Sequence, residues 1–390
     1  MKAKQLKEFL KMAYWLVPDK YIRPVKMQGY DNIVFSKDSN MGLVAQSLTR
    51  MIAFKTNVDF LHTFWLNRRV LKNILSSAEE GVIFYPGEKT VGMSLPGICD
   101  ITINNRFDED MYGAMRMSSN AYPLFSSRLF SDLTDIGPEE IKKIKTASAF
   151  TSTDDLRVNL NNALIDGEDI VATDATALYV KRGAIKRKAG SEHQDIYISR
   201  EVAKVLPLRD AWNISYICDQ DFKRFYRYQS EDITIIERIS DEEMTYPKWQ
   251  SLIKDTKGWN TLVFDKKEIL RVLKGMMIYP ASLSLIRIET FGDKRVDLKG
   301  WIAGGEYYVG DKANDPIITA RSLMMDDESR CEALVGAFST QKLIGCIQAI
   351  EDAKITIAIQ KGQERLDRGV TINDQVLLMP MHITHYENES

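Results

Sequence analysis

The chain has 390 residues, 44% of them hydrophobic and 27% charged, and its formal net charge is −2. This length predicts two or three domains, and the composition is typical of a soluble globular protein. The charge excludes a polycation, so any nucleic-acid contact requires basic residues gathered on one surface.

No apolar run approaches the roughly 18 residues that a membrane span needs, so no membrane partner is expected. The N-terminal segment is charged and amphipathic, which favours a helix of the mature protein over a signal peptide. The four cysteines lie far apart without a CxxC pair: Cys99, Cys218, Cys331 and Cys346. This spacing argues against a zinc site or a disulfide framework and fits a reducing compartment.

The first third of the chain predicts helices and strands in alternation. A helix is expected over 2–17, because Lys4, Lys7 and Lys11 recur at three- and four-residue spacing opposite an apolar face. A second helix is expected over 67–77, with Asn67 as its N-cap. Strands are expected at 32–35, 42–47, 51–56, 81–85, 90–94 and 98–104.

The middle third begins with a helix over 139–147, because Pro138 and two acidic residues suit a first turn. The stretch 150–180 then predicts a meander of half-buried strands with a tight turn at 166–168. The evidence is the alternation of apolar positions: Val158 and Leu160, Ala163 and Ile165, and Ile170 and Ala172. A helix from Arg200 to Arg209 follows, and then strands at 212–218, 224–228 and 233–239.

The last third repeats this plan. Asp265 and Ser339 are predicted N-caps of two helices, the second of which ends near Ile350. Strands are expected at 261–264, within 284–309, and at 354–360 and 375–383. The Tyr-Pro pairs at Tyr122 and Tyr246 are 124 residues apart, a distance that indicates domain duplication. The predicted fold is therefore α+β, with three tandem similar domains at 1–127, 128–256 and 257–390, each holding two helices and antiparallel sheets.

Five of the six predicted helices carry net positive charge on a short face, while acidic residues concentrate in turns such as 108–110 and 166–169. A charged helix face is usually only solvated. Five basic faces in an acidic chain, however, indicate one surface meant for phosphates, which Lys and Arg bind without reading sequence.

Three passages resemble the bacterial β-type DNA sliding clamp, the beta subunit of DNA polymerase III. The first runs from Asp155 to Asn161 and on to the Ala-Thr-Asp at 172–174. The second is the aromatic-Pro-x-aromatic pattern at 246–249, with a counterpart at 122–125. The third is the Met-Pro-Met at 379–381. Together with the repeated plan, these passages extend the resemblance over nearly the whole chain.

The resemblance implies a non-catalytic ring without a cofactor, formed by a head-to-tail homodimer whose helices line a central hole. Its partners would be double-stranded DNA, bound without sequence preference, a DNA polymerase, a clamp loader and other proteins that carry clamp-binding peptides. The implied location is the cytoplasm of a bacterial cell or of a phage-infected host.

By position, the resemblance implies three sets of site residues. The DNA contacts would be Lys4, Lys7, Lys11, Arg23, Arg68, Arg69, Lys72, Lys142, Lys143, Arg157, Arg200, Lys204, Lys266, Lys267 and Lys274. The partner-peptide groove would use Leu160, Thr173, Ala175, Leu178, Leu377, Met379, Pro380 and Met381. The dimer interface would use Tyr112, Ile278 and Tyr279.

The chain departs from the family near the implied groove. Ala175-Thr176-Ala177 stands where the family has Gly-His-Arg, Lys254 replaces an expected proline, and 384–390 extend beyond the usual end. These departures favour a divergent clamp, of the kind that a phage or a mobile element encodes, with its own peptide preference.

Two other functions stay open. A clamp-fold paralogue could bind peptides without encircling DNA. The sixth helix is compatible with this alternative, because its one basic residue is Lys342. A metal-dependent nucleic-acid-processing enzyme could use the acids at 154–155, 166–169 and 326–328. Separately, His382 and His385 at the terminal strand could bind a metal. Turn chemistry explains those acids better. Neither a nucleophile elbow nor a phosphate-binding glycine loop is present.

Overall fold

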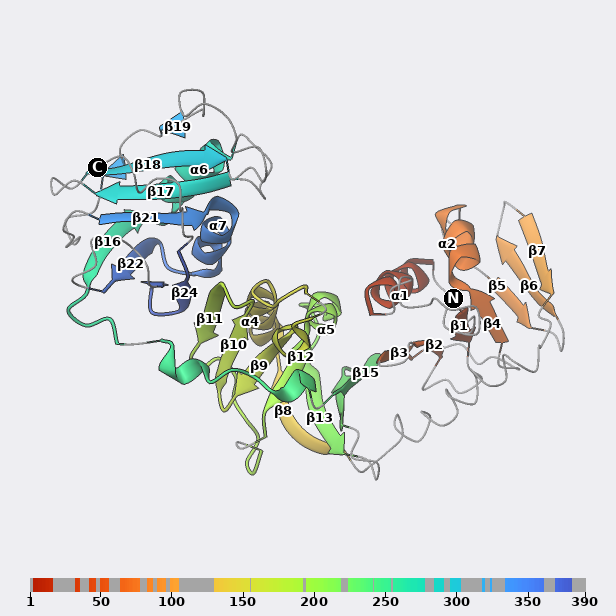
Figure 1. The fold of residues 1–390 in the computed structure, drawn as a ribbon. Coiled ribbons are helices and arrows are strands. Elements are labelled where there is room, and N and C mark those ends of the chain that lie inside the picture. Colours follow the sequence, from red (N-terminus) through yellow and green to blue (C-terminus); the bar gives the residue numbers. More distant parts are fainter. Residues whose placement is uncertain are drawn as a thin grey trace. The chain divides into compact units, whose positions relative to one another are not determined.

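The computed structural model describes residues 3–16, 32–35, 42–46, 50–55, 64–77, 83–86, 90–95, 99–104, 130–154, 156–191, 194–218, 224–240, 242–253, 255–277, 284–290, 295–302, 318–319, 323–324, 334–360 and 369–380 (Figure 1). The chain divides into two compact units. One comprises Met1–Lys145, Ile165–Glu168 and Ala184–Met244, and the other Thr146–Leu164, Asp169–Gly183 and Thr245–Ser390. Both units are built from separated segments, so the three sequential domains stay a prediction.

All six predicted helices are present: α1 (Ala3–Leu16), α2 (Arg68–Ser77), α4 (Pro138–Ser148), α5 (Arg200–Val205), α6 (Lys266–Met276) and α7 (Thr340–Ala349). The side chains of Asn67 and Asp265 accept hydrogen bonds from the backbone N–H groups of Arg69 (3.0 Å) and Glu268 (2.9 Å). The Ser199 hydroxyl caps α5 in the same way, and that of Ser339 caps α7. These caps satisfy N–H groups that the first helical turn leaves unpaired, which is why the helices begin where the sequence predicts.

The first eight-stranded antiparallel sheet lies within the first unit. Its order is β4 (Phe64–Asn67), β1 (Asn32–Phe35), β2 (Leu43–Gln46), β3 (Arg50–Phe54), β15 (Ile233–Ile239), β14 (Arg224–Gln229), β13 (Trp212–Cys218) and β8 (Ser131–Ile136). At its centre β3 pairs with β15, where Nε of Arg50 lies 2.6 Å from Oε1 of the buried Glu237. Segments more than 180 residues apart thus share one sheet.

The second eight-stranded sheet has the order β12 (Ile196–Ser199), β9 (Asn162–Asp166), β10 (Asp169–Thr173), β11 (Ala177–Lys181), β24 (Val376–Leu378), β23 (Val370–Ile372), β22 (Lys354–Ile359) and β16 (Asn260–Asp265). Its central joint is the antiparallel pair β11–β24, in which Leu178 lies opposite Leu377. This joint brings the middle of the sequence to its last described strand.

The structure corrects two predictions for the stretch 150–180. Val158–Leu160 is a 3-10 turn, η3, and not part of a strand. Strands β9 to β11 are buried on both faces: in β10, consecutive Ile170, Val171 and Ala172 are all fully buried. The sequence pattern misleads because small apolar residues such as Ala172 suit either face of a sheet.

Two smaller sheets complete the described strands. One contains β19 (Ile318–Thr319), β18 (Arg295–Ile302), β17 (Ser284–Thr290) and β21 (Leu334–Ser339), with β20 (Leu323–Met324) also paired to β18. The other contains β5 (Ile83–Pro86), β6 (Thr90–Leu95) and β7 (Cys99–Asn104). The predicted strand at 375–383 is wrong in length, because strand structure ends at Leu378 and residues 381–383 lie outside the described part.

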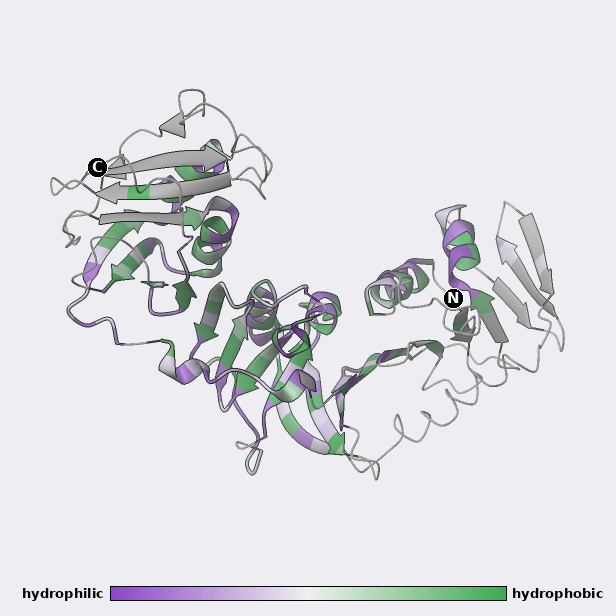
Figure 2. Ribbon diagram, in the orientation of Figure 1, coloured by the Kyte–Doolittle hydropathy of each residue, from purple (hydrophilic) through white to green (hydrophobic). Residues whose placement is uncertain are grey.

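The helices cover the sheets with their apolar faces. In the first unit α1 contacts β2 and β3, and in the second α7 contacts β11, β17, β21 and β24. Figure 2 shows hydrophobic and hydrophilic residues on different sides of α1 and α2. Within the described residues, no helix has the length and apolar character needed to cross a membrane.

Candidate nucleic-acid interface and peptide groove

Helix α1 separates its charged and apolar residues cleanly. Lys4, Lys7 and Lys11 are exposed, whereas Leu6, Leu10 and Ala13 are buried against the sheet and the neighbouring helices. The acid among these lysines, Glu8, is paired with Arg209 at 2.7 Å. The exposed face of α1 therefore presents ammonium groups while its carboxylate is already compensated.

Helix α2 divides its two arginines between different roles. Arg69 and Lys72 are exposed, but Arg68 is only 1% exposed. Its guanidinium lies 4.7 Å from the centre of the Tyr14 ring, and Nη1 donates a hydrogen bond of 3.4 Å to the Ala13 carbonyl. Arg68 holds α2 against α1 and is not part of the exposed basic surface, although the resemblance implied a DNA contact for it.

Helices α4 and α5 also carry exposed lysines. Lys142 and Lys204 are exposed, while Lys143 and Arg200 are half-buried. The Lys143 amine donates to the carbonyl oxygen of Ala184 at 3.4 Å.

In the second unit, Lys267, Arg271 and Lys274 of α6 are exposed. Lys266 is half-buried, and its amine donates to the backbone carbonyl of Ile350. Arg271 was not among the predicted contacts, although its spacing from Lys267 and Lys274 is the signal that could have added it. Arg157 is exposed on the loop before η3, and Arg23 lies outside the described residues.

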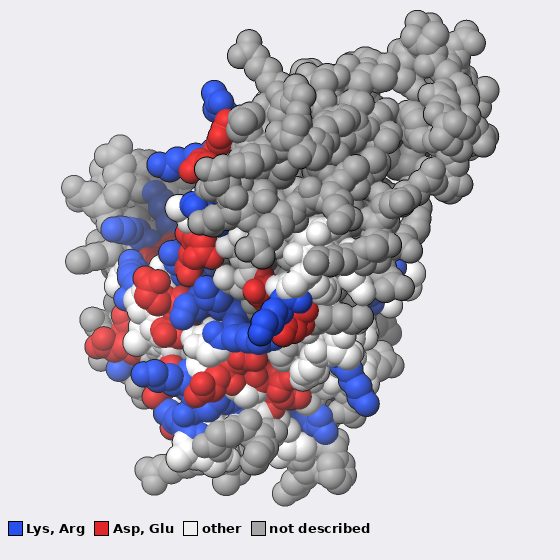
Figure 3. Space-filling model, turned by 90° about the vertical axis from the view of Figure 1, so that its left-hand side faces the viewer, with Lys and Arg blue, Asp and Glu red and all other residues white. Residues whose placement is uncertain are grey.

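Acidic residues also lie on the described surface. Figure 3 shows Lys and Arg interspersed with Asp and Glu over the described surface that faces the viewer. The basic surface is therefore a property of particular helix faces and not of whole units.

The turn between β10 and β11 carries two of the residues predicted for the peptide groove, Thr173 and Ala175. Asp174 organises it: Oδ1 accepts hydrogen bonds from the N–H groups of Thr176 and Ala177, each at 2.9 Å. Ala175 has a φ of 72°, in the left-handed region that glycine adopts most easily. The Thr173 hydroxyl supports it by accepting from the Ala175 N–H at 3.1 Å.

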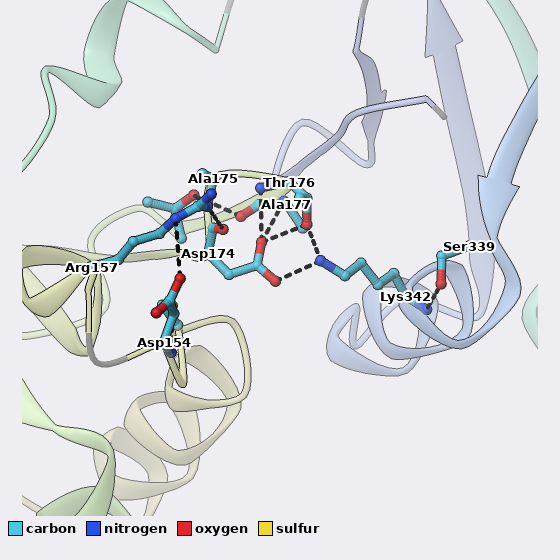
Figure 4. A network of polar contacts seen from close by, with 10 residues as sticks. Asp154, Arg157, Asp174, Ala175, Thr176, Ala177, Ser339 and Lys342 are labelled. Carbon is cyan, nitrogen blue, oxygen red and sulfur yellow. Dashed lines mark hydrogen bonds and ion pairs between the residues drawn. The ribbon is translucent and has the colours of Figure 1, made fainter. Parts of the chain in front are cut away.

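The turn is tied to α7 by the one lysine of that helix. Figure 4 shows the Lys342 side chain reaching the turn, where its amine lies 2.8 Å from Oδ2 of Asp174 and also contacts the Thr176 hydroxyl. Burial by itself would raise the pKa of the Asp174 carboxyl, but the hydrogen bonds from Lys342, Thr176 and the backbone lower it below its ordinary range. The turn therefore carries a carboxylate fixed in charge and position.

The chain that leaves β24 carries three more of the residues predicted for the peptide groove. The Met379 N–H donates to the Thr176 carbonyl at 2.9 Å, so the end of the described chain runs directly beside the turn. Met379 is 42% exposed and Pro380 and Leu377 are half-buried. Leu160, Thr173 and Leu178 are buried, and Leu178 pairs with Leu377 across the sheet. Met381 lies outside the described residues.

Two residues that sequence reasoning missed contact the predicted groove residues. Lys342 fixes the turn as described. Gly369 leaves space for two side chains of the predicted groove, because a Cβ at that position would lie 2.6 Å from Cδ1 of Leu377 and 3.0 Å from Sδ of Met379. Neither role has a local sequence signal, since each depends on a contact between distant segments.

The remaining predicted sites are only partly described. Tyr112, Ile278 and Tyr279 of the implied dimer interface lie outside the described residues, as do Lys254, His382 and His385. Among the described residues, no group of three or more His, Cys, Asp or Glu side chains is placed to hold a metal ion.

No family model matches the sequence, and no curated protein does either. Solved structures match over nearly its whole length. The DNA polymerase III subunit beta of Pseudomonas aeruginosa is 14% identical, with a TM-score of 0.72, and the match covers 98% of this chain and 99% of that one. The beta subunit of Thermotoga maritima is 16% identical, and the sliding clamp of Bacillus subtilis 15%; each has a TM-score of 0.72 and 98% coverage of both chains. The predicted fold class is confirmed.

Proposed function

We propose that this chain, which has the fold of the bacterial DNA polymerase sliding clamps, is a non-catalytic clamp that encircles duplex DNA. The observation that carries the proposal is the set of exposed Lys and Arg side chains on α1, α2, α4, α5 and α6, in a chain whose net charge is −2. Phosphates attract such residues without regard to base sequence, so a ring lined by them would hold DNA and still slide.

The proposed ring is a head-to-tail homodimer working in the cytoplasm with a clamp loader and a DNA polymerase. The solution mass tests the dimer: light scattering should give about twice 44.6 kDa at micromolar concentration. A monomer at that concentration would contradict the ring and would favour the peptide-binding paralogue. One observation supports that second candidate, because the single lysine of α7 is engaged by Asp174.

The groove beside the β10–β11 turn is proposed to bind short peptides of the polymerase and other partners. Met379 and Leu377 offer apolar contacts, and a thioether side chain repacks around different anchors. The Ala175-Thr176 turn, tied to Lys342, gives this groove a rim unlike the glycine-histidine pair of the family. We therefore expect a peptide preference of its own.

Substitution at Met379 tests the groove. Peptides selected from a random library on the whole chain should lose at least about tenfold in affinity with Met379→Glu, because a carboxylate would replace an apolar contact. Leu208→Glu is the matched control, since Leu208 is 49% exposed but lies in the other unit. Equal loss in both variants, or in neither, would count against this groove.

A further inference from the structure

A cavity of about 380 Å³ lies between α1 and α2 in the first unit. Its described lining consists of Lys7, Leu10, Lys11, Tyr14, Trp15, Lys72, Leu75 and Ser76. Leu10 and Leu75 are buried, whereas Trp15 is 50% exposed and Tyr14 half-buried. The pocket therefore has an apolar floor, aromatic walls and a volume in the range of small-ligand sites.

Cations surround the two aromatic rings. The Lys204 amine lies 4.4 Å from the centre of the Trp15 ring, and the Lys72 amine lies 5.3 Å from that of Tyr14. Lys7, Lys11 and Lys72 are all exposed at the pocket. The acid nearest in sequence, Glu8, is engaged by Arg209. The site thus pairs flat aromatic surface with an excess of positive charge.

We propose that this pocket binds one unpaired nucleotide of single-stranded DNA. The base enters the pocket and stacks against the Trp15 ring, and the flanking phosphates meet Lys7, Lys11 and Lys72. A base offers a flat aromatic ring with negative charge on either side, which matches the walls and rim together, and aromatic stacking accepts any base. An uncharged apolar peptide would match the apolar walls but would not complement the positive charge of the exposed lysines at the rim.

This inference rests on the proposed DNA contact of α1 and α2 but not on ring closure. It adds a second mode of binding, in which a strand freed from the duplex is held beside the basic helix faces. Duplex DNA cannot use the pocket in this way, because its bases remain stacked and paired.

The test is the affinity of the whole chain for a fluorescent oligothymidylate of eight residues, measured by anisotropy. Trp15→Ala should weaken binding about tenfold or more, whereas Trp15→Phe, which keeps an aromatic face, should stay within about threefold. Leu208→Ala is the control for loss of an exposed apolar side chain. Unchanged affinity in Trp15→Ala, in a variant whose melting temperature is that of the parent chain, would overturn the proposal.

The salt dependence tests the phosphate contacts separately. The double variant Lys11→Gln, Lys72→Gln should flatten the slope of log affinity against log salt by about 1.4, or 0.7 for each lost contact with a single strand. Lys186→Gln with Lys257→Gln removes two exposed lysines elsewhere and should leave the slope unchanged. Equal flattening by both pairs would overturn a localised site.

Two further measurements distinguish binding of a DNA strand from binding of a free nucleotide, and failure of the pocket from failure of the clamp. Thymidine monophosphate alone should compete only weakly; competition as strong as that of the octamer would overturn the strand in favour of a free nucleotide. Retention of the parent chain on closed circular duplex reports on the clamp itself. If the parent chain is not retained while Trp15→Ala still loses the oligonucleotide, the ring fails and the pocket stands.

Discussion

At the scale of single residues, Asp174 joins the β10–β11 turn, α7 and Arg157 through its carboxylate and its backbone carbonyl. Oδ1 holds the β10–β11 turn closed, and Oδ2 faces the Lys342 amine of α7. The carbonyl oxygen of the same residue accepts from Nη1 of Arg157 at 3.4 Å. A carboxylate that accepts several hydrogen bonds is stabilised in its charged form, which accounts for the lowered pKa.

Asp174→Asn should therefore reduce the free energy of unfolding by about 1 kcal/mol at pH 7, because the charge that pairs with Lys342 is lost. The folded-state pKa lies below the ordinary value of 3.8, so this stabilisation is complete above 3.8 and disappears as pH falls through the folded pKa. Urea unfolding at pH 7 and pH 3 measures both effects. A difference between the two proteins that grows at pH 3 would contradict this account.

The neighbours Arg68 and Arg69 give a matched pair of substitutions with opposite expectations. Arg68→Ala should lower the free energy of unfolding by about 2 kcal/mol, since it removes buried packing and leaves the Ala13 carbonyl without that donor. Arg69→Ala should lower it by less than Arg68→Ala does, because the Arg69 side chain is exposed, and should instead weaken DNA binding. Denaturant unfolding and DNA affinity, measured on both variants, would contradict the assignment if the two effects were exchanged.

At the scale of elements, the helices follow local rules and so could be predicted. Their N-caps at Asn67, Ser199, Asp265 and Ser339 are residue types that supply a side-chain oxygen to the first turn, and each caps the helix that follows. The strands were harder to predict, because a strand that is buried on both faces lacks the alternation of apolar and polar residues. The short β23 was missed for the same reason: all three of its residues are buried.

Helix α7 also carries an internal glycine that its geometry does not require. A Cβ at Gly345 would meet nothing within 4 Å, and the position is exposed. Gly345→Ala should therefore raise the free energy of unfolding by about 0.5–1 kcal/mol, because alanine loses less conformational freedom in a helix. Thermal unfolding checks this, with Gly369→Ala as the contrast that should not stabilise. A lower melting temperature for Gly345→Ala would contradict the open position.

At the scale of the whole molecule, the sequence predicted the fold class but not the pairing of distant strands that positions the candidate sites. The repeated order of helices and strands and three short passages of resemblance predicted the fold class. The pairing of β3 with β15 and of β11 with β24 could not be predicted, since register between distant strands has no local signal. The roles of Lys342, Gly369 and Arg68 all depend on such tertiary contacts.

The central claim is that the chain holds DNA by encircling it, and topology gives the most direct test. The chain should be loaded onto nicked circular duplex with the proposed clamp loader and then separated from free protein by gel filtration at about 0.15 M salt. We predict that it stays with the circles and is lost when a single restriction cut makes them linear. Equal retention on circular and linear DNA, or none on either, would contradict the clamp.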